Sequence, residues 1–363
     1  MKPRSIAVAI ACGAVGAVAG LAAVAGVIYR KQIKSAASLK RLTDYADGYD
    51  LYAIDIAYDY DLDRIIAADV RDDQAYIDAA VAQVLPGVPA HVRAPQFACS
   101  AFAAVDAEGR VRTGRNYDFK DDTSALLVRN YPRGDYASIG FAALNNLSAN
   151  APLDSVAGRA AALMGPFAQL DGVNECGVSI AVLTLDSKPC DQDTQRPVIN
   201  TSLAIRLVLD RAATTQEAVD LLSAYDMHAM AGRDYHFFIN DAAGDARVVE
   251  WDPRDPDRAC KATPVRQVTN FYACYADEVL PNQKNGELGH GKERALAIAD
   301  VLDAHAGAQD EAVAWKALRA AAQEPNPEDV TSNTQWSVVF DNTEPAAAIT
   351  LRRHWGDVDA FAL

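Results

Sequence analysis

The sequence predicts an α+β fold in which helices pack on the outer faces of antiparallel sheets. Strand patterns and helix patterns occur in separate runs rather than in strict alternation. Three segments have the pattern of a β-hairpin, in which two apolar strands flank a short turn. Half of the 363 residues are hydrophobic and 23% are charged, as expected for a globular chain with a large core.

The predicted elements follow one another from residue 97 onward. The first hairpin joins strands at 97–105 and 110–116 through the turn DAEG. The second hairpin is YHFFINDAAGDARVVEW, with its turn at Ala243 and Gly244, and the third is WSVVFDNTEPAAAITLR. Further strands are predicted at 178–185 and in VRQVTNF. Helices are predicted at 201–212, around 218–222, at 291–305 and at 311–322. Thr214 and Glu217 have capping-box spacing before the second helix.

Three parts are expected: a membrane anchor or signal segment at 1–34, a pro-segment or linker at 35–98, and a catalytic domain at 99–363. Residues 5–29 carry no charge, and as a helix this run would span roughly 37 Å, enough to cross a bilayer. Two interpretations compete: an uncleaved anchor, or a signal peptide cut after the Ala-Val-Ala at 23–25. We favour the anchor because Arg30 and Lys31 follow the run directly. Membrane contact is therefore expected through residues 5–29, with the protein anchored or exported and the extracytoplasmic face favoured.

Charge and cysteine spacing exclude several classes of partner. The formal net charge of −15 argues against nucleic-acid binding, because an acidic chain repels phosphate backbones. The six cysteines contain no Cys-x-x-Cys pair and the chain contains no His-Glu-x-x-His, so no zinc site is expected. We expect no metal and no cofactor. The disulfide pattern and a homo-oligomeric state are left open.

The first hairpin carries the main candidate for chemistry. An isolated cysteine is usually a small buried hydrophobic residue, but Arg115 and Asp118 follow Cys99 on the paired strand. A hairpin folds its far end back beside its start, so a thiol, a guanidinium and a carboxylate are expected to converge. A nearby arginine favours the thiolate form of cysteine. The carboxylate needs a second cation, and an α-amino group on Cys99 itself would supply one.

Several motifs in order resemble the linear amide C–N hydrolases. These are N-terminal-nucleophile enzymes of the choloylglycine hydrolase, penicillin V acylase and acyltransferase group. The motifs are Cys-Ser-x-Phe from Cys99, GRNYDF from Gly114, and Asn174-Glu175-x-Gly177 before a strand. HFFINDAAGDARVVEW, VTNF with Asn270, KERALAI with Arg294, and TQWSVVFD continue the resemblance as far as about Arg353. Ser100 and Cys176 depart from the family pattern, which often has Thr and Lys there.

The resemblance implies a four-layer αββα sandwich and a self-processing hydrolase of N-acyl compounds. Cys99 would become the N-terminal nucleophile after cleavage behind Ala98 and would form a thioester acyl-enzyme. By the same resemblance, Asp118 would hold the new α-amine and Arg115 would favour the thiolate. Asn174 and Asn270 would stabilise the oxyanion, and Arg294 would complete the charge network.

Two alternatives stay open at this stage. The acyl group could pass to an amine acceptor, as in isopenicillin N acyltransferase, rather than to water. A non-catalytic, surface-anchored binding protein of the same fold is the alternative from another class. If the cysteine has a side-chain base instead of its own amine, His236 is the best partner in the sequence. The sequence does not define which small-molecule N-acyl amide is the substrate.

Overall fold

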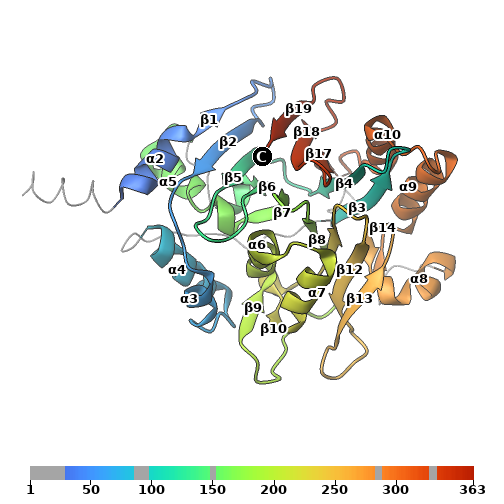
Figure 1. The fold of residues 1–363 in the computed structure, drawn as a ribbon, viewed down its shortest axis with the longest axis horizontal. Coiled ribbons are helices and arrows are strands. Elements are labelled where there is room, and N and C mark those ends of the chain that lie inside the picture. Colours follow the sequence, from blue (N-terminus) through green and yellow to red (C-terminus); the bar gives the residue numbers. More distant parts are fainter. Residues whose placement is uncertain (1–28, 86–97, 148–152, 283–287, 327–332) are drawn as a thin grey trace, which may run out of the picture.

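Two large β-sheets and the helices that cover them form the body of the protein (Figure 1). The structure is a computed structural model that describes residues 29–85, 98–147, 153–282, 288–326 and 333–363. The predicted anchor at 5–29 lies outside the described residues except for Tyr29. No helix within the described ranges is long and apolar enough to cross a membrane.

The nine-stranded sheet has the order β1-β2-β5-β6-β7-β8-β11-β12-β13. Its neighbouring strands are antiparallel except β2 and β5, which are parallel. The bounds are β1 Lys40–Arg41, β2 Leu51–Ile56, β5 Ala125–Asn130, β6 Ser138–Ala143, β7 Gln169–Asn174, β8 Ser179–Leu185, β11 Asp234–Asn240, β12 Ala246–Trp251 and β13 Cys260–Pro264.

The six-stranded sheet has the order β14-β3-β4-β17-β18-β19 and is antiparallel throughout. Its bounds are β3 Ala98–Val105, β4 Val111–Asp118, β14 Gln267–Val268, β17 Thr334–Asp341, β18 Ala346–Leu351 and β19 Asp359–Ala362. Two short pairs complete the strands: β9 Val198–Asn200 with β10 Asp226–His228, and β15 Asn270–Phe271 with β16 Gly289–His290.

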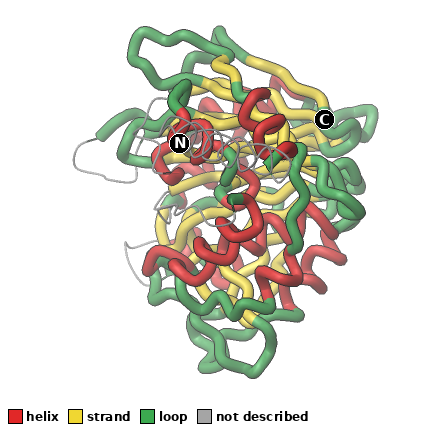
Figure 2. The backbone as a smooth tube through the Cα atoms, turned by 90° about the vertical axis from the view of Figure 1, so that its left-hand side faces the viewer, coloured by secondary structure: helices red, strands yellow, loops and turns green. Residues whose placement is uncertain are grey.

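The layers run helix, sheet, sheet, helix. On one outer side, α9 (Lys292–Ala304) and α10 (Glu311–Ala321) pack on β3, β4, β14 and β17. On the other, α6 (Thr201–Arg211) and α7 (Thr215–Ser223) pack on β7, β8, β11 and β12. The sheets meet face to face through β3 with β8 and β17 with β7. Figure 2 shows the helices in red against the yellow strands.

The predicted elements are present with small shifts at their ends, except that the strand expected in VRQVTNF is divided into β14 and β15, which belong to different sheets. Thr214 Oγ1 accepts from Glu217 N at 3.1 Å, as the capping-box spacing predicts, and starts α7. The Glu217 carboxylate bonds the amide of Ala213 rather than that of Thr214. Gly244 forms the turn between β11 and β12 with φ +80°. The alternating and helical patterns therefore predicted the body of the domain well.

The described part of the predicted pro-segment, residues 35–85, packs into the same core as the rest of the chain. It supplies β1, β2, α3 (Leu62–Ile66), α4 (Asp73–Val84) and the last turn of α2 (Arg30–Ser38). Strand β2 pairs with β5 along its whole length, and four of its six side chains are buried. The remaining helices are α5 (Val156–Ala162) and α8 (Ala276–Asn282). The end of the predicted pro-segment or linker, residues 86–97, lies outside the described residues.

Candidate active site

The β3–β4 hairpin brings Cys99 and Arg115 together on the face that looks toward the nine-stranded sheet. Cys99 lies opposite Tyr117, and Ala101 opposite Arg115, so the thiol and guanidinium are diagonal neighbours on one face. Arg115 Nη2 lies 3.3 Å from Cys99 Sγ and donates to Val182 O at 3.2 Å. Both side chains are fully buried. This contact was expected from the hairpin pattern.

Asp118 lies on the opposite face of the hairpin, which corrects the expected three-way convergence. Arg115 and Asp118 are three residues apart, and side chains alternate between faces with a period of two. Asp118 accepts from Thr334 Oγ1 at 2.6 Å and Gln323 Nε2 at 2.8 Å. Arg294 links its carboxylate to Cys99, because Nη1 lies 3.4 Å from Asp118 Oδ2 and donates to Cys99 O at 2.8 Å. The backbone of Asp118 also hydrogen-bonds the Cys99 side chain.

Arg115 has a buried counter-ion that the sequence did not indicate. Its Nε lies 3.0 Å from Oδ2 of Asp171, which stands on β7 in the facing sheet. The guanidinium carbon also lies 5.1 Å from the ring centroid of Tyr117 and 5.9 Å from that of Trp336. No motif includes Asp171, because the contact joins two sheets and has no local spacing. Arg115 is thus fixed by one carboxylate and two aromatic rings.

Burial dominates the electrostatics of the site. It raises the pKa of the Cys99 thiol to about 12, although Arg115 opposes the shift. Burial also raises the pKa of Asp118, against the stabilising effect of Arg294. The pKa of Asp171 rises to about 6 for the same reason, despite the neighbouring Arg115. With an amide at position 99, the thiol is therefore protonated near neutral pH.

Asn270 and Arg294 reach Cys99 from β15 and from the first turn of α9. Asn270 Oδ1 accepts from the backbone N of Cys99 at 3.2 Å and from Arg294 Nη2 at 2.7 Å. Asn270 Nδ2 donates to Thr184 O at 2.8 Å. Gly291 precedes α9 with φ +89°, and a Cβ there would lie 2.6 Å from Arg294 Nη2. The glycine thus lets Arg294 lie close against the turn.

Asn174 does not approach Cys99, contrary to the expected oxyanion role. Its Nδ2 donates to Leu209 O at 3.2 Å and Ala212 O at 2.7 Å, at the end of α6. Its Oδ1 accepts from the amides of Cys176 and Val178 in the β7–β8 turn. Asp171 and Asn174 are three residues apart on β7, so they point to opposite faces of the sheet. Asn174 therefore has a structural position on the helix-covered face.

The other candidate base is also engaged elsewhere. His236 Nδ1 lies 3.2 Å from Glu250 Oε2, and its Nε2 lies 3.0 Å from Thr269 O. Neither ring nitrogen contacts Cys99 Sγ, so the geometry gives no Cys–His pair. Within the described ranges there is no cluster of three or more His, Cys, Asp or Glu that could hold a metal ion.

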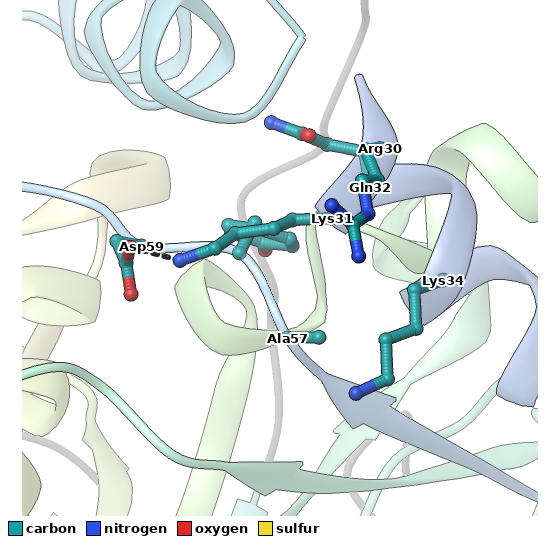
Figure 3. A pocket seen from close by; sticks show the side chains of 7 residues that line it. Arg30, Lys31, Gln32, Lys34, Ala57 and Asp59 are labelled. Atoms are coloured by element: carbon teal, nitrogen blue, oxygen red, sulfur yellow. Dashed lines mark hydrogen bonds and ion pairs between the residues drawn. The ribbon is translucent and has the colours of Figure 1, made fainter. Parts of the chain in front are cut away.

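A cavity of about 770 Å³ lies at the start of α2 (Figure 3). Its lining includes Arg30, Lys31, Lys34 and Asp59, and Lys31 pairs with Asp59. None of its lining residues belongs to the cluster around Cys99.

All five cysteines in the described part of the chain are free.

Comparison with known proteins places this arrangement in a family. Residues 105–354, more than half of the chain, match the family described as acyl-coenzyme A:6-aminopenicillanic acid acyl-transferase. Sequence comparison with curated proteins found no match. A mutant conjugated bile acid hydrolase from Clostridium perfringens has a similar structure, with TM-score 0.56 and 15% identity over 73% of this chain and 92% of that one.

A second similar structure is penicillin V acylase from Agrobacterium tumefaciens. The TM-score is 0.53 and the identity 19%, over 73% of this chain and 86% of that one. At these identities the two structures show a shared fold. Together with the family match, they confirm the family relationship predicted from the motifs. The chain belongs to the acyl-coenzyme A:6-aminopenicillanic acid acyltransferase family.

Proposed function

We propose that the protein is a self-processing amide hydrolase that uses Cys99 as an N-terminal nucleophile on N-acyl compounds. One observation carries the proposal: every backbone and side-chain polar group of Cys99 has a partner suited to this chemistry. Sγ faces Arg115, the backbone N faces Asn270 Oδ1, and the carbonyl oxygen accepts from Arg294. Any buried residue needs partners for its backbone groups, but a cysteine that only filled the core would not need a guanidinium beside its thiol.

Self-cleavage would use the same thiol. Cys99 Sγ attacks the carbonyl carbon of Ala98, the C–N bond breaks, and the thiol proton passes to the departing Cys99 nitrogen. The product is a thioester between Ala98 and Cys99, which water then hydrolyses to free the thiol and a carboxyl group on Ala98. The hydrogen bond from the Cys99 nitrogen to Asn270 Oδ1 holds this atom before and after the cut.

Substrate turnover repeats the sequence with a free amine as the base. The α-amine of a peptide has an ordinary pKa of about 7.7–8.0, so it can take the thiol proton near neutral pH. Sγ attacks the amide carbonyl, the amine proton passes to the leaving nitrogen, and a thioester acyl-enzyme forms. The amine then deprotonates a water molecule that releases the acid. Arg115 favours the thiolate, and the neighbouring Asn270 is the candidate oxyanion donor through Nδ2.

Acyl transfer to an amine is the second candidate, favoured by the description of the matching family. The two reactions share every step up to the thioester and differ only in whether water or an amine attacks it. Adding a primary amine to the assay separates them. Formation of a new amide in preference to the free acid would identify a transferase.

We also propose that the apolar run at 5–29 keeps the protein on a membrane. Its length and lack of charge support this, as does the basic sequence RKQIK that follows. Cell fractionation with N-terminal sequencing tests it. An N-terminus near Gly26 on a soluble fragment would favour the signal peptide instead.

The test of the function is a panel of N-acyl amides assayed with purified, processed protein. Cys99→Ala should abolish both turnover and self-cleavage, because one thiol serves both reactions. Cys176→Ala is the matched control, since it removes a cysteine thiol in the β7–β8 turn, and it should keep both activities. Turnover that survives in Cys99→Ala would refute the proposal. A wild-type chain that is inactive on every acyl amide would favour the non-catalytic alternative.

A further inference from the structure

The segment that carries Asn270 is held at both ends by one buried pair of side chains. His236 on β11 and Glu250 on β12 come next to the cross-strand pair of Phe237 with Val249, and both are fully buried. His236 Nε2 lies 3.0 Å from the carbonyl oxygen of Thr269, immediately before Asn270. Glu250 Oε2 and Oε1 accept from the amides of Ala273 and Cys274, at 3.0 and 2.6 Å. The pair therefore grips residues 269–274 on either side of Asn270.

The partners of His236 fix the number of protons in the pair. The Thr269 carbonyl can only accept, so Nε2 must carry a hydrogen to bond it at 3.0 Å. Nδ1 then faces the Glu250 carboxylate at 3.2 Å, and two lone pairs at that distance would repel. One further proton must lie between them. It belongs either to an imidazolium beside a carboxylate or to a carboxylic acid beside a neutral imidazole.

We infer that the Glu250–His236 pair shares one trapped proton and acts as a clamp that positions Asn270 at Cys99. The inference rests on the proposed function for its catalytic consequence. The clamp does not contact the nucleophile, so His236 and Glu250 are positioning residues. The Thr269 side chain also holds this segment in place, because its Oγ1 donates to Gly291 O at 2.9 Å, in the turn that precedes Arg294.

A loose clamp should affect the reaction more than substrate binding. Asn270 Oδ1 receives the Cys99 nitrogen, and its Nδ2 is the candidate oxyanion donor. Displacing it weakens interactions made in the transition state, so kcat falls while KM changes little. Loss of general packing instead would lower the amount of folded enzyme and its melting temperature without such a split.

Substitution of Glu250 gives a matched pair of variants. In Glu250→Gln the amide N–H can donate to Nδ1 of a neutral His236, so a covalently held hydrogen replaces the shared proton. The amide nitrogen then stands in the place of Oε2 and cannot accept from Ala273 N, whereas the amide oxygen keeps the bond from Cys274 N. Glu250→Leu has a similar size and offers no hydrogen. Glu250→Gln keeps the contacts to His236 and Cys274, whereas Glu250→Leu loses these and the contact to Ala273. We therefore expect Glu250→Leu to lose kcat about tenfold or more and Glu250→Gln to lose clearly less, with KM within about twofold in both. His228→Phe, which removes a histidine paired with Asp191 outside the clamp, is the control.

A second readout does not depend on activity. In protein labelled with 15N-histidine, we expect His236 Nε2 to carry a slowly exchanging proton in wild type, in Cys99→Ala and in Glu250→Gln. The signal is assigned by its loss in His236→Phe. In Glu250→Gln the His236 imidazole should carry a proton on Nε2 and none on Nδ1.

The outcomes separate the clamp from the proposed function. An Nε2 without a proton, or an unchanged kcat in folded Glu250→Leu, would overturn the clamp. A wild-type enzyme that is inactive on every amide while the Nε2 proton is present would refute the function and leave the clamp standing.

Discussion

Cutting the chain behind Ala98 should leave two pieces that stay together. Leu51, Ile54 and Ile56 of β2 are at most 1% exposed. Burying a side chain of this size stabilises by about 1.5–3 kcal/mol, so the three contribute roughly 5–9 kcal/mol. Ile77, Val81 and Val84 of α4 contribute a similar amount. Burial of the two sets stabilises the complex of the two pieces by roughly 10–18 kcal/mol. The translational and rotational freedom that the pieces lose on association costs about 4–15 kcal/mol. Other buried residues of the segment, such as Tyr58 and Ile65, add to the favourable side.

The assay is native size-exclusion chromatography with intact-mass detection. Both pieces should elute as one particle, at the volume of the uncut Cys99→Ala chain, and should separate only in denaturant. If no natural cut occurs, a protease site placed within residues 86–97 supplies one. A chain begun at Cys99 alone should fold poorly, because β5 loses its partner β2. Separation of the pieces in native buffer, with the Cys99 piece still folded and active, would refute the reasoning.

Further predictions concern four substitutions in and near the site. Asn270→Ala should lower kcat by roughly 10²–10³-fold if Asn270 is an oxyanion donor. Asn174→Ala should instead lower the melting temperature and leave kcat per folded molecule unchanged. Steady-state kinetics and thermal melts that show the reverse pattern would contradict both roles. Burial raises the pKa of Asp171 from 3.8 to about 6, so the folded chain keeps a proton in this range that the unfolded chain has lost. This contribution to stability is complete below about pH 4 and is lost as the pH rises through 6; Asp171→Asn should therefore gain melting temperature relative to wild type between pH 4 and 7, and a constant gap would argue against the shift. Gly291→Ala should lower the melting temperature and kcat together, because φ is +89° and the new Cβ would meet Arg294 Nη2 at 2.6 Å; a wild-type melt and rate would show that the turn adapts.

Local patterns predicted much of the fold and part of the site. Alternation and capping signals set the hairpins and the four main helices, because these elements depend on neighbouring residues. The hairpin also predicted the contact of Cys99 with Arg115. It did not place Asp118, since an odd spacing on a strand points the side chain to the other face. The same alternation separates Asp171, which meets Arg115, from Asn174, which does not.

Contacts between distant segments could not be read from the sequence. The pairing of β2 with β5 joins residues 51–56 to 125–130, which lie before and after Cys99 in the sequence. Nothing in the Asp- and Tyr-rich sequence around β2 indicates this pairing. The partners of Asp118, Gln323 and Thr334, likewise come from more than 200 positions away. Such contacts are set by how the sheets and helices pack, which single-sequence periodicity does not encode.

The most direct test of the mechanism compares chains whose N-terminus is known. Mass spectrometry identifies molecules still joined at Ala98 and molecules that begin at Cys99, and the amide assay gives the turnover of each. An amide nitrogen cannot act as a base near neutral pH, so the uncut chain should be inactive and the cut complex active. If chains proven uncut turn over substrate as fast as chains that begin at Cys99, the N-terminal-nucleophile mechanism is wrong.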